Sequence, residues 1–290
     1  MFIDIHAHAV RIPAAPFLGF QTFPTPEQLL NRYRELNVDR GILLPLVSPE
    51  VYLPQANEDI LEMAERFPGK FIPFCNIDPR VVSNSFDAPL DRCLKYYKDK
   101  GCRGVGEVTV NLPFLHPLVQ NLFKHTQEAG LPLTFHIAPQ MGGCYGIHDD
   151  PGLPQLEQCL GKFSKLKFLA HSATFWAEIS RLETPADRRG YPSYPVNEEG
   201  VVPKLFRRYP NLLGDLSAGS GCNALTRDPD YAAHFLAEFQ DRLFFGIDIC
   251  KPDGPAPLAG FLVKLRDEKK ISQDVFSKVT RENAVKLLGL

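Results

Sequence analysis

The chain has 290 residues, which is enough for two average domains or for one α/β barrel. Hydrophobic residues make up 44% and charged residues 23%, an ordinary globular composition that excludes disordered, collagen-like and fibrous proteins. The formal net charge of -2 provides no overall basic field, so we expect no nucleic-acid partner.

The sequence shows no targeting or membrane signal. No apolar stretch approaches the ~18 residues that a membrane helix needs. Residues 1–6 lack the basic and apolar regions of a signal peptide. We therefore expect a cytoplasmic protein without membrane contact. The seven cysteines form no Cys-x-x-Cys pair, so neither a disulfide framework nor a thiolate zinc site is indicated.

Short apolar runs recur along the whole chain, each about as long as a buried strand and bounded by Gly, Pro, Asp or Asn. In chain order the eight predicted strands are Phe2–Ile5, Gly41–Leu46, Phe71–Ile77, Gly104–Val108, Pro132–Ile137, Leu166–Ala170, Asn211–Leu216 and Leu243–Ile247. Helical spacing of apolar residues predicts helices over Pro26–Leu36, Asn57–Phe67, Leu90–Lys100, Pro117–Ala129, Leu153–Phe163, Glu199–Tyr209, Pro229–Phe239, Pro257–Glu268 and Gln273–Leu288.

The alternation of strands and helices predicts parallel βαβ units. Eight such units predict a closed (β/α)8 TIM barrel, an α/β fold of ~250 residues, and we expect a single domain over residues 1–290. An open doubly wound sheet is the alternative, but no G-x-G-x-x-G follows the first strand to support a dinucleotide-binding version.

Three connections are too long for simple turns: Ala9–Thr25, Ala138–Gly152 and Ser172–Glu198. Loops of this length in compact domains usually serve as lids or binding loops. All three follow predicted strands, which in a barrel places them at the C-terminal face, where barrel enzymes have their active sites.

Polar residues end five of the predicted strands. They are His6 and His8, then Glu107, His136, His171 and Asp248. His6 and His8 are two residues apart and so share one face of the first strand, with Asp4 below them. Because the strand ends of a barrel converge on its axis, we expect these residues to form one cluster. A histidine or glutamate at any single position is more often structural, and Glu107 has the alternative of pairing with Arg103.

Imidazole and carboxylate donors together suit a divalent transition metal. Zinc is the expected ion, in one or two copies, with manganese, iron and nickel as alternatives. The predicted metal ligands are His6, His8, Glu107, His136 and Asp248, joined by His171 if two ions bind. A metal-bound hydroxide would attack a carbonyl, with Asp248 as general base and His171 as an assisting acid.

The ordered motifs resemble the amidohydrolase superfamily, in particular its amidohydrolase-related branch, which includes aminocarboxymuconate-semialdehyde decarboxylase and pyrone-dicarboxylate lactonase. The matching segments are 4–8, 130–136, 170–172, 246–248 and 281–289. The resemblance implies a barrel with one or two metals, metal positions at His6, His8, His136 and Asp248, a catalytic or second-metal role for His171, and an acid-base role for Asp248. Glu107 departs from the decarboxylases and is similar to the metal-bridging Glu of TatD-type hydrolases.

The expected function is therefore metal-dependent hydrolysis of a small ester, lactone or amide. The alternatives are a nonoxidative decarboxylase, a two-metal phosphoesterase, a metal-free lactonase and a binding barrel without turnover. Candidates for substrate contact are Trp176, Arg181 and His148, with Arg188 and Arg189 as further anion ligands in the same loop as Arg181. Phe17, Phe20, Phe23 and Trp176 are candidates for an apolar wall, with anchoring of their loops to the barrel as the alternative. A small-molecule substrate is the expected partner, and a homodimer the expected assembly, since two-fold dimers are commonest.

Overall fold

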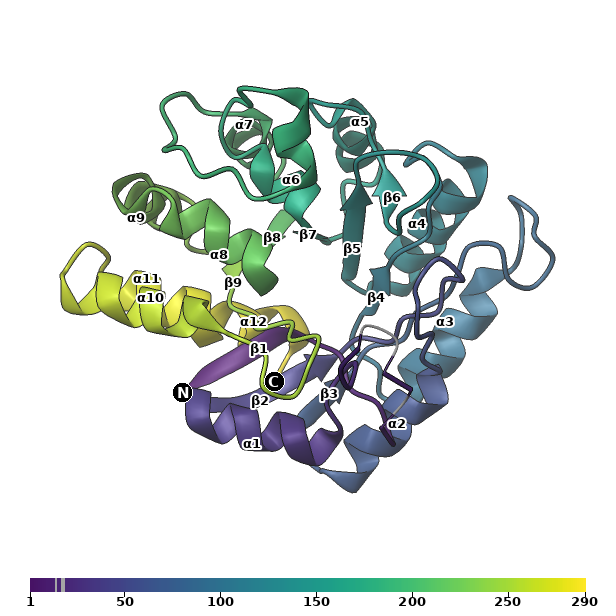
Figure 1. Ribbon diagram of the computed structural model, residues 1–290. Helices are drawn as coiled ribbons and strands as arrows, with labels where there is room; N and C mark the ends of the chain where they lie inside the picture. Colours follow the sequence, from purple (N-terminus) through teal and green to yellow (C-terminus); the bar gives the residue numbers. More distant parts are fainter. Residues whose placement is uncertain (14, 17–18) are drawn as a thin grey trace.

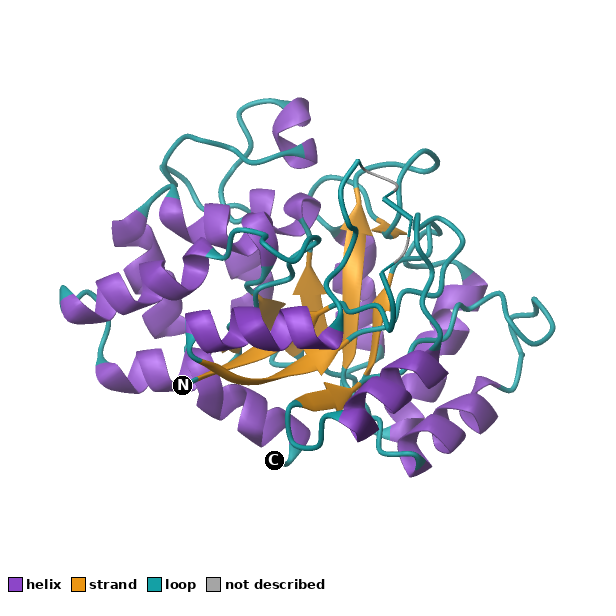
Figure 2. Cartoon of the chain, turned by 60° about the horizontal axis from the view of Figure 1, so that its bottom comes forward, coloured by secondary structure: helices purple, strands orange, loops and turns teal. Residues whose placement is uncertain are grey.

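The computed structural model describes residues 1–13, 15–16 and 19–290, so Phe17 lies outside the described residues. Parallel strands occupy the interior and helices surround them (Figures 1 and 2). The barrel strands are β1 (Phe2–Ala7), β2 (Val38–Leu43), β3 (Phe71–Pro73), β4 (Val105–Val108), β5 (Leu133–Ala138), β7 (Phe168–His171), β8 (Leu212–Asp215) and β9 (Leu243–Phe244). Each lies within or close to one of the eight predicted runs.

Two seams close the strands into a ring. The ladders run in the orders β1-β2-β3 and β4-β5-β7-β8-β9. Between β3 and β4, the Cys75 amide donates to the Gly104 carbonyl at 3.0 Å, and the Gly106 amide donates to the Cys75 carbonyl at 2.8 Å. Beyond β9, the Phe245 carbonyl accepts from the Ile5 amide of β1 at 2.9 Å. The predicted (β/α)8 barrel is therefore confirmed.

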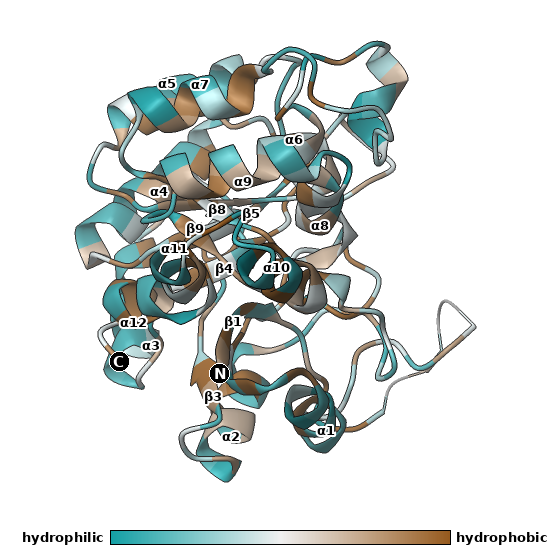
Figure 3. Ribbon diagram, turned by 90° about the vertical axis from the view of Figure 1, so that its left-hand side faces the viewer, coloured by the Kyte–Doolittle hydropathy of each residue, from teal (hydrophilic) through white to brown (hydrophobic). Residues whose placement is uncertain are grey.

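Helices cover the outside of the barrel. They are α1 (Pro26–Leu36), α2 (Asn57–Arg66), α3 (Leu90–Asp99), α4 (Pro117–Ala129), α5 (Pro154–Lys162), α7 (Val201–Arg208), α9 (Pro229–Glu238) and α10 (Pro257–Asp267). Helix α1 shows how the local sequence sets its bounds: Thr25 and Gln28 form a capping box at the start, and Asn37 ends the helix in the left-handed conformation. Figure 3 shows hydrophilic residues on the outer turns of helices such as α1 and hydrophobic residues along the strands.

The barrel interior is filled by aliphatic and aromatic side chains below the strand ends. Ile42 of β2, Leu169 of β7, Leu213 of β8 and Phe244 of β9 belong to one buried cluster although they come from opposite sides of the ring. Because close-packed interiors resist deformation, this layer provides a rigid floor for the polar residues above it.

The long connections contain structure that their sequences did not predict. Strand β6 (Ile147–His148) pairs with β5, while α6 (Ala173–Ala177) and the 3-10 helix η1 (Pro185–Arg189) lie in the loop after β7. Helix α8 (Ala218–Thr226) follows β8, and its sequence, which contains two glycines, lacks the apolar stripe that would have predicted it.

The predicted last helix, Gln273–Leu288, is divided into α11 (Gln273–Ser277), the π-helix η2 (Lys278–Glu282) and α12 (Asn283–Leu288). Within the part of the chain that the structure describes, no helix combines the length and the apolar character that crossing a membrane requires.

Candidate active site

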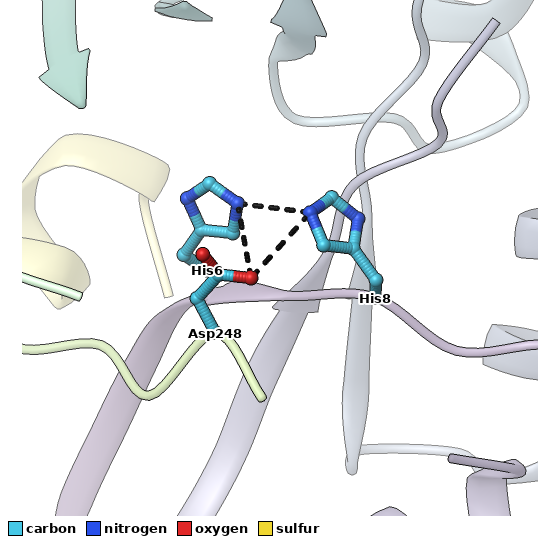
Figure 4. A group of neighbouring side chains, drawn as sticks. All are labelled: His6, His8 and Asp248. Carbon is cyan, nitrogen blue, oxygen red and sulfur yellow. Dashed lines mark hydrogen bonds and ion pairs between the residues drawn. The ribbon is translucent and has the colours of Figure 1, made fainter. Parts of the chain in front are cut away.

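The structure brings the six strand-end residues together at the carboxyl end of the barrel. His6 and His8 come from the end of β1, and Glu107, His136 and His171 lie in β4, β5 and β7. Asp248 follows β9 and turns toward the two histidines of β1 (Figure 4). Its backbone has φ 41°, a left-handed conformation that is costly for a non-glycine residue, and its amide donates to the His6 carbonyl at 3.0 Å.

Hydrogen bonds fix which ring nitrogens of His6 and His8 carry protons. The Nδ1 of His8 lies 2.8 Å from the Leu44 carbonyl, which can only accept. The Nδ1 of His6 lies 2.6 Å from the Asp215 carboxylate. Both Nδ1 atoms therefore donate, so that the Nε2 atoms of the two rings, which lie 3.0 Å apart, are the positions left to bind a cation. Such an arrangement calls for a cation between them, and partners on the far nitrogen are typical of metal-binding histidines.

The distances around these lone pairs fit a single divalent ion. Glu107 Oε2 lies 3.6 Å from His6 Nε2 and 3.4 Å from His8 Nε2. Asp248 Oδ1 lies 3.9 and 3.7 Å from the same two atoms. Ligands about 2.0–2.2 Å from one tetrahedral ion are separated by roughly 3.3–3.6 Å. His6, His8, Glu107 and Asp248 thus form a donor set whose atoms already have near-ligand spacing.

The remaining oxygens of the two carboxylates point to the other histidines. Glu107 Oε1 lies 3.1 Å from His136 Nδ1, and Asp248 Oδ2 lies 3.4 Å from His171 Nε2. Donor atoms of Glu107, His136 and His171 lie within 4.8 Å of one another, so they form a second group able to hold an ion. Glu107 contributes one oxygen to each group, which is the arrangement of a bridging carboxylate.

The electrostatics keep the carboxylates ionised. Burial by itself raises the pKa of Asp248 and of Glu107, but the positive potential of His6 and the neighbouring imidazoles outweighs burial and lowers both. The pKa of Asp215 is lowered in the same way, with His6 and His171 as its partners. These groups are negative at neutral pH and can neutralise a bound cation.

Sequence reasoning missed Asp215, the partner that orients two of the histidines. Its Oδ2 accepts from His6 and lies 3.5 Å from His171 Nδ1, which is also 3.1 Å from Ser217 Oγ. Asp215 is the last residue of β8 and is fully buried. The signal that found the other members, a polar residue at the end of an apolar run, was present in Asn211–Leu216 and was not applied there.

Asp4 lies apart from the cluster. Its carboxylate accepts from the Tyr33 hydroxyl at 2.8 Å and from the amides of His6 and Ile247. The register of β1 shifts between Asp4 and Ala7, so simple alternation does not hold there. Asp4 therefore ties β1 to α1 and to the loop after β9, where strict alternation had placed it directly below the imidazoles.

A small pocket of about 40 Å3 opens onto this centre. Its wall combines His8, Glu107, His136, His171 and Asp248 with residues from the surrounding loops: Phe23, Leu46, Val51, Tyr52, Tyr145 and Cys250. The Phe23 ring is stacked on Tyr52 at 6.0 Å, and Tyr145 lies against His136 at 4.7 Å.

The structure places the predicted substrate-contact residues outside this wall. Trp176 is buried, and its Nε1 donates to the Asp215 carbonyl at 2.8 Å. Arg181 is exposed and pairs with Glu198 at 2.9 Å. His148, on β6, has Nδ1 3.4 Å from the Ala138 carbonyl. Trp176 and Arg181, both in the segment after β7, thus have partners away from this wall.

Of the other residues predicted to contact substrate, the two further arginines lie outside the pocket wall and one phenylalanine lies in it. Arg188 is buried in a pair with Glu178, and Arg189 lies beside it in η1. Of the predicted apolar wall, Phe23 lines the pocket, whereas Phe20 is 39% exposed.

A barrel with imidazoles and carboxylates converging at its carboxyl end defines a class of metal-dependent barrel enzymes. The family model described as amidohydrolase matches residues 3–290, and the chain belongs to this family. This confirms the resemblance stated from the sequence motifs. A search of curated proteins found no match.

Solved structures with the same fold include 5-carboxyvanillate decarboxylase from Sphingomonas paucimobilis (17% identity, TM-score 0.64, covering 100% of this chain and 99% of that one). A probable 2-pyrone-4,6-dicarboxylic acid hydrolase from Acinetobacter baumannii, with citric acid bound, has 14% identity and a TM-score of 0.57, with 100% and 99% covered. An amidohydrolase from Burkholderia multivorans with bound zinc has 15% identity and a TM-score of 0.60, with 100% and 99% covered. At these identities the likeness shows the fold.

Proposed function

We propose that this protein hydrolyses a small ester, lactone or amide with a divalent metal, for which zinc is the first choice. The observation that carries the proposal is the position of Asp248. One of its oxygens faces the lone pairs of His6 and His8, the other lies 3.4 Å from His171, and the side chain borders the pocket. The nitrogen and oxygen donors suit zinc, and the Burkholderia amidohydrolase of the same fold has zinc bound.

His6, His8, Glu107 and Asp248 would hold the ion. When bound, the ion polarises a substrate carbonyl and makes water more acidic. Asp248, ionised because the imidazoles lower its pKa, accepts the proton of the attacking water while the new C–O bond forms at the carbonyl carbon. The proton then passes to the leaving oxygen or nitrogen as the ester or amide bond breaks.

His171 is positioned to assist the leaving group. Ser217 and Asp215 lie at its Nδ1, and this places Nε2 toward Asp248 and the pocket. Burial and the charge of His6 lower the pKa of His171, but Asp215, Asp248 and Glu107 outweigh them, so the net shift is upward. A raised pKa favours a proton on the ring, as a proton donor near neutral pH requires.

Nonoxidative decarboxylation is the second candidate. It is supported by the shared fold of 5-carboxyvanillate decarboxylase and uses the same residues with a carboxylated substrate. One carboxylate oxygen of Glu107 faces His8 and the other faces His136, which also favours two ions. Two ions would support phosphoester hydrolysis as a third reaction.

The test is Asp248→Asn, assayed on a panel of small lactones and esters by titration of the acid released. We expect turnover to fall by about 10²–10⁴-fold with the fold intact, because a positioned general base contributes about that much. Arg208→Gln, at an exposed pair with Glu157, is the control. Release of CO2 from carboxylated aromatics without acid from any lactone or ester would instead support the decarboxylase.

A further inference from the structure

The residues of the pocket wall limit which substrates can bind, beyond what the proposed metal-binding residues require. Beyond the residues of the metal centre, the wall consists of Phe23, Leu46, Val51, Tyr52, Tyr145 and Cys250. Phenols and thiols are neutral near pH 7, and the other three side chains are hydrocarbon. Among the described residues, no lysine or arginine lines this pocket.

Two basic side chains on the loops near the pocket, Arg80 and Lys251, are paired with carboxylates. Arg80, after β3, contacts Asp78 at 2.6 Å and Glu50 at 2.8 Å. Lys251, next to Cys250, lies 3.6 Å from Asp253. Neither Arg80 nor Lys251 lines the pocket, where it could receive a second anionic group of a substrate.

The centre itself offers little net positive charge. If one divalent ion is bound by His6, His8, Glu107 and Asp248, its two charges face the three carboxylates of Glu107, Asp215 and Asp248. A substrate carboxylate away from the ion would therefore enter a partly apolar pocket without a partner. Burial of an unpaired charge costs several kcal/mol, so such a substrate is disfavoured.

The size of the pocket limits the substrate further. Its 40 Å3 is only a few times the ~10–15 Å3 that one water molecule needs. The loops that form the wall contact one another: the Phe23 ring is stacked on Tyr52, and the Phe23 amide donates to the Cys250 carbonyl at 2.8 Å. The phenols of Tyr52 and Tyr145 add polar groups without charge to this wall.

We propose that the pocket accepts a compact, uncharged acyl group and discriminates against substrates with a free carboxylate away from the reacting carbonyl. This inference rests on the proposed hydrolase function and narrows it to neutral small lactones, esters or amides. Leu46 and Val51 form the apolar side of the wall, and the other side chains of the wall outside the metal centre carry no charge near pH 7.

The experiment compares two ligands with the same metal-binding head. Butanohydroxamate ends in a methyl group, and succinic monohydroxamate carries a carboxylate in its place. Binding of each to the zinc-loaded protein is measured by calorimetry. We expect the neutral ligand to bind at least tenfold more tightly. Equal or tighter binding of the carboxylate, or failure of both ligands to bind, overturns the inference.

A variant tests whether the preference for the neutral ligand arises because no cationic side chain lines the pocket wall. Cys250→Lys adds a positive charge at an exposed position of the wall, and we expect it to reduce the preference for the neutral ligand at least tenfold or to reverse it. Gln158→Lys, on the exposed side of α5, adds the same charge at a distance and should leave the preference unchanged. An unchanged preference in Cys250→Lys also overturns the inference. The comparison in the unmodified protein does not depend on either variant.

Hydrolysis is measured separately, so that the two proposals can fail independently. If the protein prefers butanohydroxamate but releases acid from no neutral lactone, ester or amide, the proposed function is wrong and the pocket inference holds. If it hydrolyses carboxylated lactones as fast as neutral ones, the proposed function holds and the inference is wrong.

Discussion

Two clusters of buried polar and charged side chains lie at the carboxyl end of this barrel, and they differ in whether the cluster includes its own cation. In the metal centre, His6 and His8 point lone pairs at each other and at two carboxylates. In the second cluster, which we call the Arg188 clasp, Arg188 donates to Glu178 at 2.6 Å and to the carbonyls of Asp149 and Asp150 at 2.8 and 3.0 Å. The clasp contains its own cation, whereas the metal centre has acceptors in excess.

The difference separates a structural cluster from a functional one. The Arg188–Glu178 pair lies within the loop after β7, and the other contacts of the clasp join this loop to the loop after β5, including the Gly152 amide that donates to Glu178 at 2.7 Å. A buried charge that is fully partnered indicates structure, and a surplus of acceptors facing a pocket indicates a binding site.

Among the tests of the difference between the two clusters, removal of the metal should have the largest effect on activity and stability. After dialysis against a chelator we expect turnover to be lost and the melting temperature to fall by roughly 10 °C, since an ion at a thousand times its Kd adds about 4 kcal/mol to stability. Elemental analysis and calorimetry before and after readdition of zinc measure both effects. Full activity in protein with less than about one ion per twenty chains would contradict a metal site.

Breaking the clasp should lower stability next most strongly. Arg188→Met leaves the Glu178 carboxylate buried without its partner, so we expect a loss of about 3–5 kcal/mol in the free energy of unfolding. Arg181→Met in the same loop breaks an exposed pair with Glu198 and should cost about 0–1 kcal/mol. Urea unfolding of the two variants measures the difference, and equal losses would show that burial of the clasp is unimportant.

Glu107→Gln should lower the affinity of the proposed site for the metal without removing the site altogether. The change removes a charge that faces both donor groups, and we expect metal affinity to fall by about a hundredfold or more, since loss even of outer partners costs about 10–100-fold. Competition with a chelating dye measures the affinity. Unchanged metal content and activity would return Glu107 to a structural role.

The smallest expected effect is a pH dependence at Asp149, whose oxygens accept from the amides of Asp150, Gln155 and Leu156 at the start of α5. Burial raises the pKa of its carboxyl to about 6 from 3.8. An acid with a raised folded-state pKa contributes stability below its unfolded pKa and loses that contribution as the pH rises through the folded value.

The comparison is therefore between the unmodified protein and Asp149→Asn, which does not titrate. The stability advantage of the unmodified protein should shrink between about pH 4 and pH 6 and then remain constant. Thermal unfolding across this range measures the advantage. An advantage that grows with pH would show that the hydrogen bonds to α5 dominate over burial.

The sequence by itself determined the barrel and the residues that the barrel brings together at the proposed metal centre. Apolar runs separated by amphipathic segments define the strands, and parallel strands in a closed ring must place their carboxyl ends together. The positions of His6, His8, Glu107, His136, His171 and Asp248 follow from that rule, because each lies at or just after the end of a run.

Only the tertiary structure decided how these side chains are held and what surrounds them. The bond from His6 to Asp215 spans 209 positions, and the register of β1 shifts after Asp4, whose carboxylate accepts from Tyr33. Arg181 and Arg188 look alike in sequence, yet one is exposed and the other is buried. Tautomers, charge balance and pocket walls depend on contacts between loops distant in the chain, and local sequence patterns carry no information about such contacts.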